Sequence, residues 1–280
     1  MATFKILTDS CCDFAADQYI QLGLEKVTLT MEFRGNVIPD RNDDSLKEIY
    51  DAMRTGESAK TAAVNPQQWA AAMKPALEAG QDVLVMAFSS GLSGTCQAAM
   101  IAAEEMEDKY PGRKIRVVDT LCAALGQGLL IWYACKKRDE GMDIDELTAW
   151  VEENKLHICH WVTVDDLSHL KRGGRISATT ALVGTMLNIK PIIHVNDEGK
   201  LINVGKIRGR KAAIEHIASK VGELGAGYNN DTCFVVHGDC EADFMDLEII
   251  NISGAAEAGQ AVVSGAGLTQ DHTGHDIDKA

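Results

Sequence analysis

The sequence predicts an α/β protein with two domains, a parallel-sheet domain followed by an α+β domain with a mixed or antiparallel sheet. Short apolar runs alternate with amphipathic segments over the first half of the chain, which is typical of a parallel sheet covered by helices. This alternation ends after about residue 156. The chain has 280 residues, enough for two hydrophobic cores. We place the boundary near Asn154–Leu156 and expect domains at 1–155 and 156–280.

The first half predicts a Rossmann-like domain. Apolar runs bounded by turn residues predict strands at Phe4–Thr8, Lys26–Phe33, Asp82–Ala87 and Lys114–Asp119. Apolar residues at helical spacing predict helices at Phe14–Leu22, Ser45–Arg54, Pro66–Ala79, Thr95–Lys109, Ala124–Arg138 and Asp143–Asn154. Proline is favoured at the first helical position, as at Pro66, and Ser45 with Glu48 fits a capping box.

The second half gives a different pattern of elements. Strands are expected at His157–Val164, Lys190–Val195, Leu201–Val204 and Thr232–His237, and helices at Leu167–Arg172, Thr180–Leu187 and Arg210–Gly222. The segment Asp197-Glu198-Gly199-Lys200 has the composition of a hairpin turn. The segment Ser253–Gly267 is rich in glycine and alanine and predicts no regular element.

Composition excludes several classes of protein. The net charge is −14, from 27 basic and 41 acidic residues, which argues against nucleic acid and anionic membranes as partners. The sequence shows neither a secretory signal nor an apolar run of the roughly 18 residues that a membrane span needs. Eight scattered cysteines without a C-x-x-C pair indicate reduced thiols, so we expect a cytoplasmic protein. Because His157, Cys159 and His160 share one expected strand, they cannot converge on a metal ion.

The turn Ser89–Thr95 joins an expected buried strand directly to a helix. Such a turn leaves the first N–H groups of the helix unpaired, at the positive end of the helix dipole. Ser90 and Ser93 add hydroxyl donors, so we expect a carboxylate or phosphate on this loop. Ser93 capping the helix is a second interpretation, compatible with the first. A nucleophile elbow, G-x-S-x-G, is excluded because Thr95 occupies the position of its second glycine.

Two further segments have both a functional and a structural interpretation. Asp9, Ser10 and Asp13, at the end of the first strand, could bind a metal ion or supply a base, but an Asp-Ser pair more often caps the next helix and binds neighbouring loops. In Lys171–Ser177, Arg175 follows two glycines. Its guanidinium could clamp a carboxylate through two hydrogen bonds. The segment could equally be a helix C-cap followed by a solvated arginine.

Several of these segments resemble, in order and spacing, the motifs of the DegV family of bacterial fatty-acid-binding proteins, which includes the carrier subunits of fatty acid kinase. The resemblance covers roughly residues 3 to 220. The segments are Thr8-Asp9-Ser10, Lys60-Thr61, Ser89–Thr95, Val118-Asp119-Thr120, Lys171–Ser177 and Ile189-Lys190-Pro191.

The resemblance implies a long-chain fatty acid in an apolar tunnel of the second domain, with its carboxylate at the domain interface. It assigns the carboxylate to Thr61, Ser93, Arg175 and His272, the last of these in His272-Thr273-Gly274, with Ser90, Gly91 and Gly94 supporting the loop. It also implies that a basic segment containing Lys206, Arg208 and Arg210 docks a kinase. From about Ser253 on, the sequence departs from the family's pattern.

These observations favour a monomeric acyl carrier without chemistry or cofactor of its own, which presents the carboxylate for acyl-phosphate formation by a kinase. Apolar residues of Thr180–Leu187 and Ile192–Val195 are candidates for the tunnel wall, or for a plain core. The alternative is an enzyme that acts on a small carboxylated or phosphorylated substrate at the same loop, with Asp9 or Asp119 as base. A lipid sensor whose partner is not a kinase is a third hypothesis.

Overall fold

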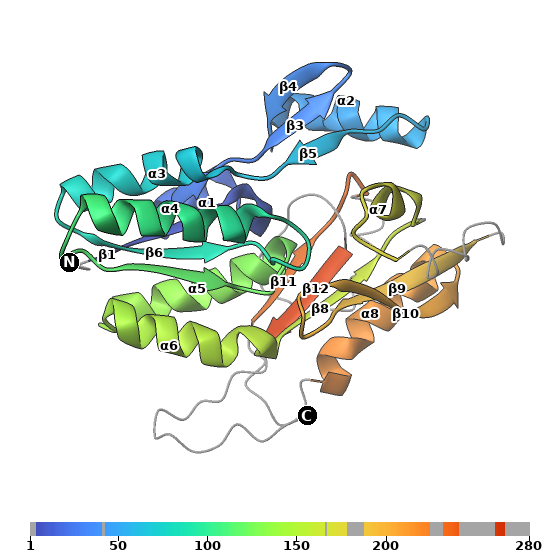
Figure 1. Cartoon of the computed structure of the whole chain (residues 1–280). Helices are drawn as coiled ribbons and strands as arrows, with labels where there is room; N and C mark the ends of the chain where they lie inside the picture. Colours follow the sequence, from blue (N-terminus) through green and yellow to red (C-terminus); the bar gives the residue numbers. More distant parts are fainter. Residues whose placement is uncertain are drawn as a thin grey trace. The chain divides into compact units, whose positions relative to one another are not determined.

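The computed structural model describes residues 4–40, 43–165, 167–177, 188–224, 232–240 and 261–266 (Figure 1). Contacts between residues divide the chain into two compact units. Unit 1 comprises Met1–Lys155 together with Glu198–Lys200, and unit 2 comprises Leu156–Asp197 and Leu201–Ala280.

Unit 1 is built on a parallel sheet, sheet A, with the strand order β2-β1-β6-β7. Its strands are β1 (Phe4–Asp9), β2 (Glu25–Val27), β6 (Asp82–Ala87) and β7 (Ile115–Asp119). Every pair of neighbours runs parallel, in a register that pairs Phe4 with Asp82 and Val83 with Ile115. The predicted α/β class with a parallel N-terminal sheet is confirmed.

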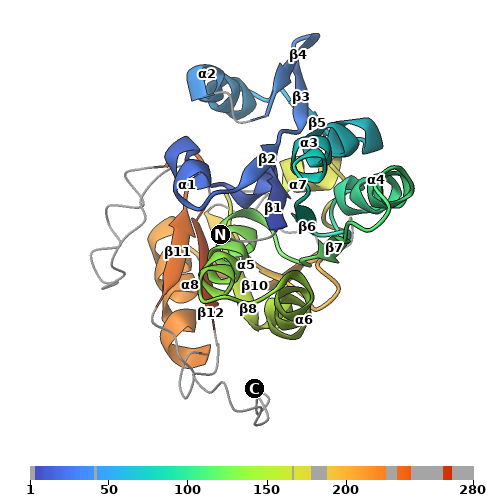
Figure 2. The same cartoon turned by 90° about the vertical axis from the view of Figure 1, so that its left-hand side faces the viewer.

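Helices cover both faces of sheet A (Figures 1 and 2). On one face lie α3 (Pro66–Glu78) and α4 (Thr95–Lys109), and on the other lie α5 (Ala124–Asp139) and α6 (Ile144–Asn154); the short α1 (Ala16–Gln21) follows β1. Because both faces are covered, the strands are continuous apolar runs, and Val83–Ala87 are all fully buried. Trp69 of α3 is also fully buried, and its indole N–H donates to the carbonyl oxygen of Thr95 at 3.1 Å.

The single strand predicted over Lys26–Phe33 is wrong. The chain leaves sheet A after β2. The Leu29 N–H donates to the Ser10 hydroxyl and not to a carbonyl oxygen of a neighbouring strand. The following residues form β3 (Thr30–Phe33), which pairs antiparallel with β4 (Asn36–Pro39) and β5 (Lys60–Ala62). Helix α2 (Asp43–Arg54) packs on this second sheet through Ile49 and Ala52.

Unit 2 is built on an antiparallel sheet, sheet C, with the strand order β10-β9-β8-β12-β11. Its strands are β8 (Ile158–Thr163), β9 (Ile189–Val195), β10 (Leu201–Arg208), β11 (Cys233–Val236) and β12 (Ala261–Ala266). Strand β12, for which the sequence predicted no element, lies between β8 and β11. The unit also contains the short helix α7 (Ser168–Arg172) and the long helix α8 (Arg210–Leu224), whereas the helix expected at Thr180–Leu187 lies outside the described residues.

The two faces of sheet C differ in what they contact. Ile192 of β9 packs with Ala213 and Ile217 of α8, so its side chain lies on the helix-covered face. Side chains alternate along a strand, which puts the neighbouring Ile193 and Val195 on the opposite face. The same alternation assigns to this opposite face, here called the distal face, the buried apolar side chains of Ile158, Val162, Ile193, Val195, Phe234 and Val236.

Candidate functional site

The carboxyl ends of β1, β6 and β7 lie at one edge of sheet A. From β1 the chain goes to β2 on one side and later returns to β6 on the other side, so the strand order reverses between β1 and β6. Open α/β sheets bind ligands outside the carboxyl ends of their strands at such a reversal. Asp9 is the last residue of β1, the loop Phe88–Gly94 follows β6, and Asp119 is the last residue of β7. This edge of sheet A is therefore the candidate site.

The backbone of the loop is already engaged within the protein. Consecutive N–H groups donate internally: Phe88 to Asp9 Oδ2, Ser89 to the Cys122 carbonyl, Ser90 to Asp119 Oδ1, Gly91 to Ser89 Oγ, and both Leu92 and Ser93 to the Ser89 carbonyl. These N–H groups precede the helix. Of the first N–H groups of the helix itself, which were expected to be unpaired, that of Thr95 donates to Ser93 Oγ at 3.3 Å. Within the described part of the chain, the Gly94 N–H and the Ser90 hydroxyl make no hydrogen bond and remain as donors for a ligand.

Ser93 stands at the last turn before α4, whose N-cap is Gly94. The Ser93 Oγ accepts the Thr95 N–H at 3.3 Å and lies 2.9 Å from the Thr95 hydroxyl. When the Thr95 hydroxyl donates in that pair, Ser93 keeps its own proton for an external acceptor. Ser93 is half-buried. The geometry thus suits a hydrogen-bond donor that is held in place by Thr95.

Asp9 is fully buried at the end of β1. Its two carboxylate oxygens accept the N–H groups of Cys11 at 3.0 Å and of Phe88 at 2.8 Å. Desolvation outweighs these hydrogen bonds and raises the pKa of Asp9 from 3.8 to about 6. The prediction that Asp9 caps the next turn and binds a neighbouring loop is confirmed.

Asp119 has a similar structural role at the end of β7. Its Oδ1 accepts the N–H groups of Ser90 at 3.1 Å and Leu121 at 3.2 Å. Both carboxylates named as bases for an enzymatic alternative are thus engaged with backbone N–H groups. This arrangement favours a role in shaping the loop over one in proton transfer.

Thr61 lies in β5, an edge strand of the second sheet of unit 1. It pairs with Met31 of β3, and all three residues of β5 are exposed. Among the described residues, no hydrogen bond joins Thr61 to Ser93.

In unit 2, Arg175 follows a helix end that the two glycines create. The Arg175 N–H donates to the Leu170 carbonyl and the Gly174 N–H donates to the Lys171 carbonyl, the pair of bonds that defines a Schellman motif. Gly174 has φ of +71°, a conformation that other residues seldom adopt. The exposed guanidinium of Arg175 donates through Nη1 to the Gly173 carbonyl. The C-cap interpretation is thereby confirmed.

The basic segment after β9 divides into exposed and engaged side chains. Lys206 and Arg208 are both exposed and alternate with half-buried residues along β10. Arg210 begins α8, and its guanidinium lies 3.4 Å from the Thr163 carbonyl and 3.7 Å from the Cys240 sulfur. Only Lys206 and Arg208 are therefore presented as an exposed basic pair.

Other predicted residues fall in different places. His272 and the candidate wall residues Thr180–Leu187 lie outside the described residues. Within Ile192–Val195, Ile192 belongs to the core beneath α8, so only Ile193 and Val195 lie on the distal face.

In the part of the chain that the structure describes, no group of three metal-ligating side chains is found, and no helix is long and apolar enough to cross a membrane. All eight cysteines are described, and each is a thiol.

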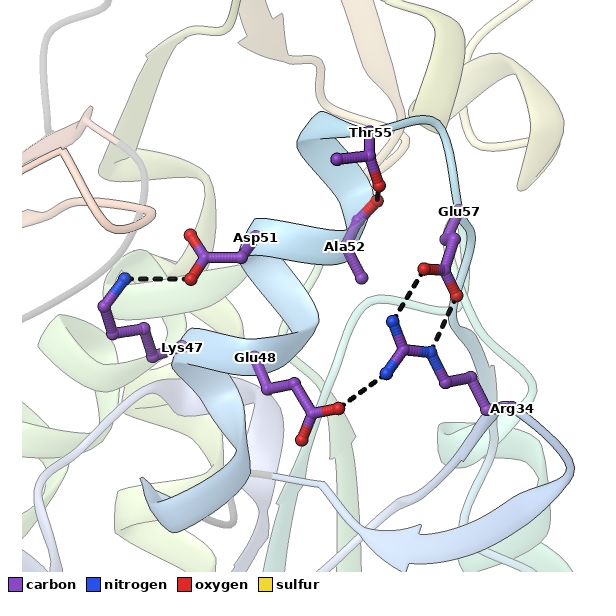
Figure 3. Close-up of a pocket in the computed structure, with 7 residues that line it drawn as sticks. All are labelled: Arg34, Lys47, Glu48, Asp51, Ala52, Thr55 and Glu57. Carbon is purple, nitrogen blue, oxygen red and sulfur yellow. Dashed lines mark hydrogen bonds and ion pairs between the residues drawn. The ribbon is translucent and has the colours of Figure 1, made fainter.

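A pocket of about 510 Å³ in unit 1 lies beside α2, and its lining includes none of the predicted site residues (Figure 3). In Figure 3 the Arg34 guanidinium reaches Glu57 through two hydrogen bonds of 2.8 and 2.7 Å, and Glu48 at 2.6 Å. This pairing holds the pKa of Glu57 below its usual value. Because the Arg34 guanidinium is already paired with two carboxylates, this pocket is a poor site for the carboxylate of a ligand. The pocket is lined by Arg34, Lys47, Glu48, Asp51, Ala52, Thr55 and Glu57.

The family model and the two relatives that follow all carry the name DegV. The model of a family described as uncharacterised proteins of the DegV family matches residues 3–260. A DegV domain-containing protein of Clostridium perfringens is 40% identical over 249 residues, which are 88% of this chain and 86% of the relative. Another from Lactococcus lactis is 39% identical over 224 residues, 78% of this chain and 76% of the relative.

Solved structures agree with this match. A DegV family protein from Thermus thermophilus, described by its fatty acid binding, has a TM-score of 0.81 and 28% identity, covering 95% of this chain and 99% of that one. A protein from Thermotoga maritima, described as revealing a fatty acid binding function, has a TM-score of 0.76 and 26% identity, covering 96% and 100%.

Because the pKa of Asp9 is elevated in the folded state, the free energy of unfolding depends on pH. The folded-state pKa of about 6 exceeds the reference value of 3.8, so the folded protein binds this proton more tightly than the unfolded chain. The contribution of Asp9 to stability therefore falls as pH rises from about 4 to about 6, by up to about 3 kcal/mol. We expect a carbon-13 NMR titration to show a carboxyl midpoint near 6 that is missing in Asp9→Asn. A midpoint near 4 would contradict this prediction.

Proposed function

This chain belongs to the DegV family, and on that premise we propose that it binds a long-chain fatty acid and presents the carboxylate to a partner kinase. The main support for this proposal is the apolar distal face of sheet C. Six buried apolar side chains from three strands lie on it. The acyl tail would bind in the 156–280 domain against this face, at Ile193 and Val195 among others.

Burial of the tail supplies most of the affinity in this proposal. Burying a methylene contributes on the order of 0.8 kcal/mol, so a tail of about fifteen carbons outweighs any single polar contact. The polar groups would set the orientation of the molecule. We assign its carboxylate to Thr61, Ser93 and Arg175, together with His272.

The loop of unit 1 supports the assignment of Ser93. Its hydroxyl is held by Thr95, and the Gly94 N–H and Ser90 hydroxyl lie on the same short segment. Gly91 supports the loop through its bond to Ser89. These donors suit a carboxylate, which accepts hydrogen bonds through both oxygens.

A kinase would dock on the basic pair Lys206 and Arg208 and phosphorylate the presented carboxylate to an acyl phosphate. Their exposure on β10 supports this role, whereas Arg210 is engaged within unit 2 and would act by shaping the segment. We further propose that the protein acts as a monomer, without a cofactor, in the reducing cytoplasm, where eight thiols persist.

Native mass spectrometry tests ligand binding directly. Protein purified from bacteria is expected to carry a non-covalent adduct with the mass of a long-chain fatty acid, because a buried tail dissociates slowly. After removal of lipid, added palmitate should restore the adduct. A protein that is purified without lipid and does not bind added palmitate contradicts the proposal. Turnover of a small carboxylated or phosphorylated compound by the protein alone would favour the enzyme alternative.

Replacing the head-group donor should weaken binding without abolishing it. We expect Ser93→Ala to lower the affinity for palmitate about tenfold to a hundredfold, as for a hydrogen bond to a charged group worth roughly 1.5–3 kcal/mol. Titration calorimetry of delipidated protein measures the change. Ser219→Ala on the exposed surface of α8 is the matched control and should bind as the wild type does. Equal affinities of Ser93→Ala and wild type would remove Ser93 from the site.

Reversing the exposed basic pair separates docking from lipid binding. The double variant Lys206→Glu, Arg208→Glu should bind palmitate normally but support acyl-phosphate formation by the kinase at less than about a tenth of the wild-type rate, because like charges repel the docking partner. The double variant Lys74→Glu, Lys109→Glu, of exposed lysines on α3 and α4, is the charge-matched control. A double variant that supports the kinase as well as the control does would place docking elsewhere.

A further inference from the structure

The turn Glu198–Lys200 packs against the candidate loop within unit 1. These three residues join the contacts of unit 1, although the residues on either side of them belong to unit 2. The hydroxyl of Ser89, which is fully buried, donates to the Gly199 carbonyl at 2.8 Å. None of the residues assigned to the ligand or to the kinase belongs to this turn.

The turn lies so close to the loop that the contact requires glycine at Gly91 of the loop and at Gly199 of the turn. A Cβ atom on Gly91 would lie 2.6 Å from the Glu198 carbonyl oxygen and 2.7 Å from that of Gly199. A Cβ atom on Gly199 would lie 2.0 Å from Ser89 Oγ, and its φ of +69° also favours glycine. At Gly91 the two backbones thus meet directly, and at Gly199 the backbone meets the Ser89 hydroxyl.

Ser89 transmits this contact to the rest of the loop. Its Oγ donates to the Gly199 carbonyl and accepts the Gly91 N–H at 3.1 Å. Its backbone carbonyl accepts the N–H groups of Leu92 and Ser93, each at 3.1 Å. The position of Ser93 is therefore defined through Ser89, whose hydroxyl direction is set by the turn.

We propose that the turn Glu198–Lys200 is a positioning element for the carboxylate-binding loop, acting through Ser89 and the facing glycines Gly91 and Gly199. None of these residues needs to touch the ligand. The inference rests on the proposed function and adds to it the source of head-group selectivity. A correctly shaped loop distinguishes a carboxylate from an alcohol on the same tail, whereas the tail itself does not.

The test compares palmitate with hexadecanol, which differ only in the head group. Gly91→Ala adds a methyl group directed at the turn, and Gly199→Ala adds one directed at Ser89. Gly222→Ala is the control for the first variant, since its Cβ meets no atom within 4 Å. Gly80→Ala is the control for the second, because φ is +75° and the added Cβ is equally uncrowded. Ser89→Ala removes the hydrogen bonds of the hydroxyl without adding an atom, so it remains informative where a larger residue prevents folding.

Loss of selectivity is the expected result. In Gly91→Ala, Gly199→Ala and Ser89→Ala the affinity ratio of palmitate to hexadecanol should fall about tenfold, the effect of one lost hydrogen bond to a charged group, with hexadecanol affinity within about twofold of wild type. General destabilisation would weaken both ligands alike. Hydrogen–deuterium exchange of the peptide covering Ser89–Ser93 should accelerate in these three variants, and in neither control.

The remaining outcomes overturn the inference in distinguishable ways. Variants that keep the wild-type affinity ratio overturn the positioning role and leave fatty acid binding intact, whether or not exchange accelerates. Unchanged exchange with a lower ratio would show that the loop is not held by the turn. A wild-type protein that binds neither palmitate nor hexadecanol overturns the proposed function itself, and with it the role of the turn in ligand selection.

Discussion

The hydrogen bonds of Asp9 cross the point where the strand order of sheet A reverses. One carboxylate oxygen holds the turn after β1 and the other holds the first N–H of the loop after β6. Burying an ionisable group costs free energy unless such bonds offset it, and the elevated pKa shows that the offset is incomplete. The Thr8 hydroxyl adds a second connection by donating to the Met86 carbonyl. These two connections fix the start of the Phe88–Gly94 loop.

Much of the framework follows from sequence patterns. Buried apolar runs such as Asp82–Ala87 predict the parallel strands, and Pro66 correctly marks the start of α3. The break between β2 and β3 could not be predicted, because it depends on Leu29 bonding to Ser10 in a distant turn. Strand β5 was missed since its three residues are all exposed and give no alternating pattern.

The candidate site was only partly predictable for a similar reason. Helix-terminus chemistry makes Ser93 a candidate, but it gives no sign that the N–H groups of the loop before the helix are paired within the protein. Their acceptors, among them Asp9 and Asp119, lie on other strands and come together only in the folded sheet. The bond from Ser89 to Gly199 spans 110 residues of sequence. Sequence patterns over a few residues carry no signal for a contact between such distant residues. The helix end at Gly173-Gly174, by contrast, depends only on neighbouring residues, and a helix C-cap was one of the two interpretations of that segment.

The position of β12 in sheet C has a consequence for biosynthesis. This strand lies between β8 and β11 and pairs Ala266 with Ile158, so the central ladder joins segments that are made far apart in time. During translation, β8 leaves the ribosome long before its partner, and sheet C cannot be completed until Ala261–Ala266 has emerged. Sheet A needs only residues before Lys155 and can form first. Unpaired strand edges bind other chains readily, so the nascent second unit is the stage at which we expect this protein to depend on chaperones.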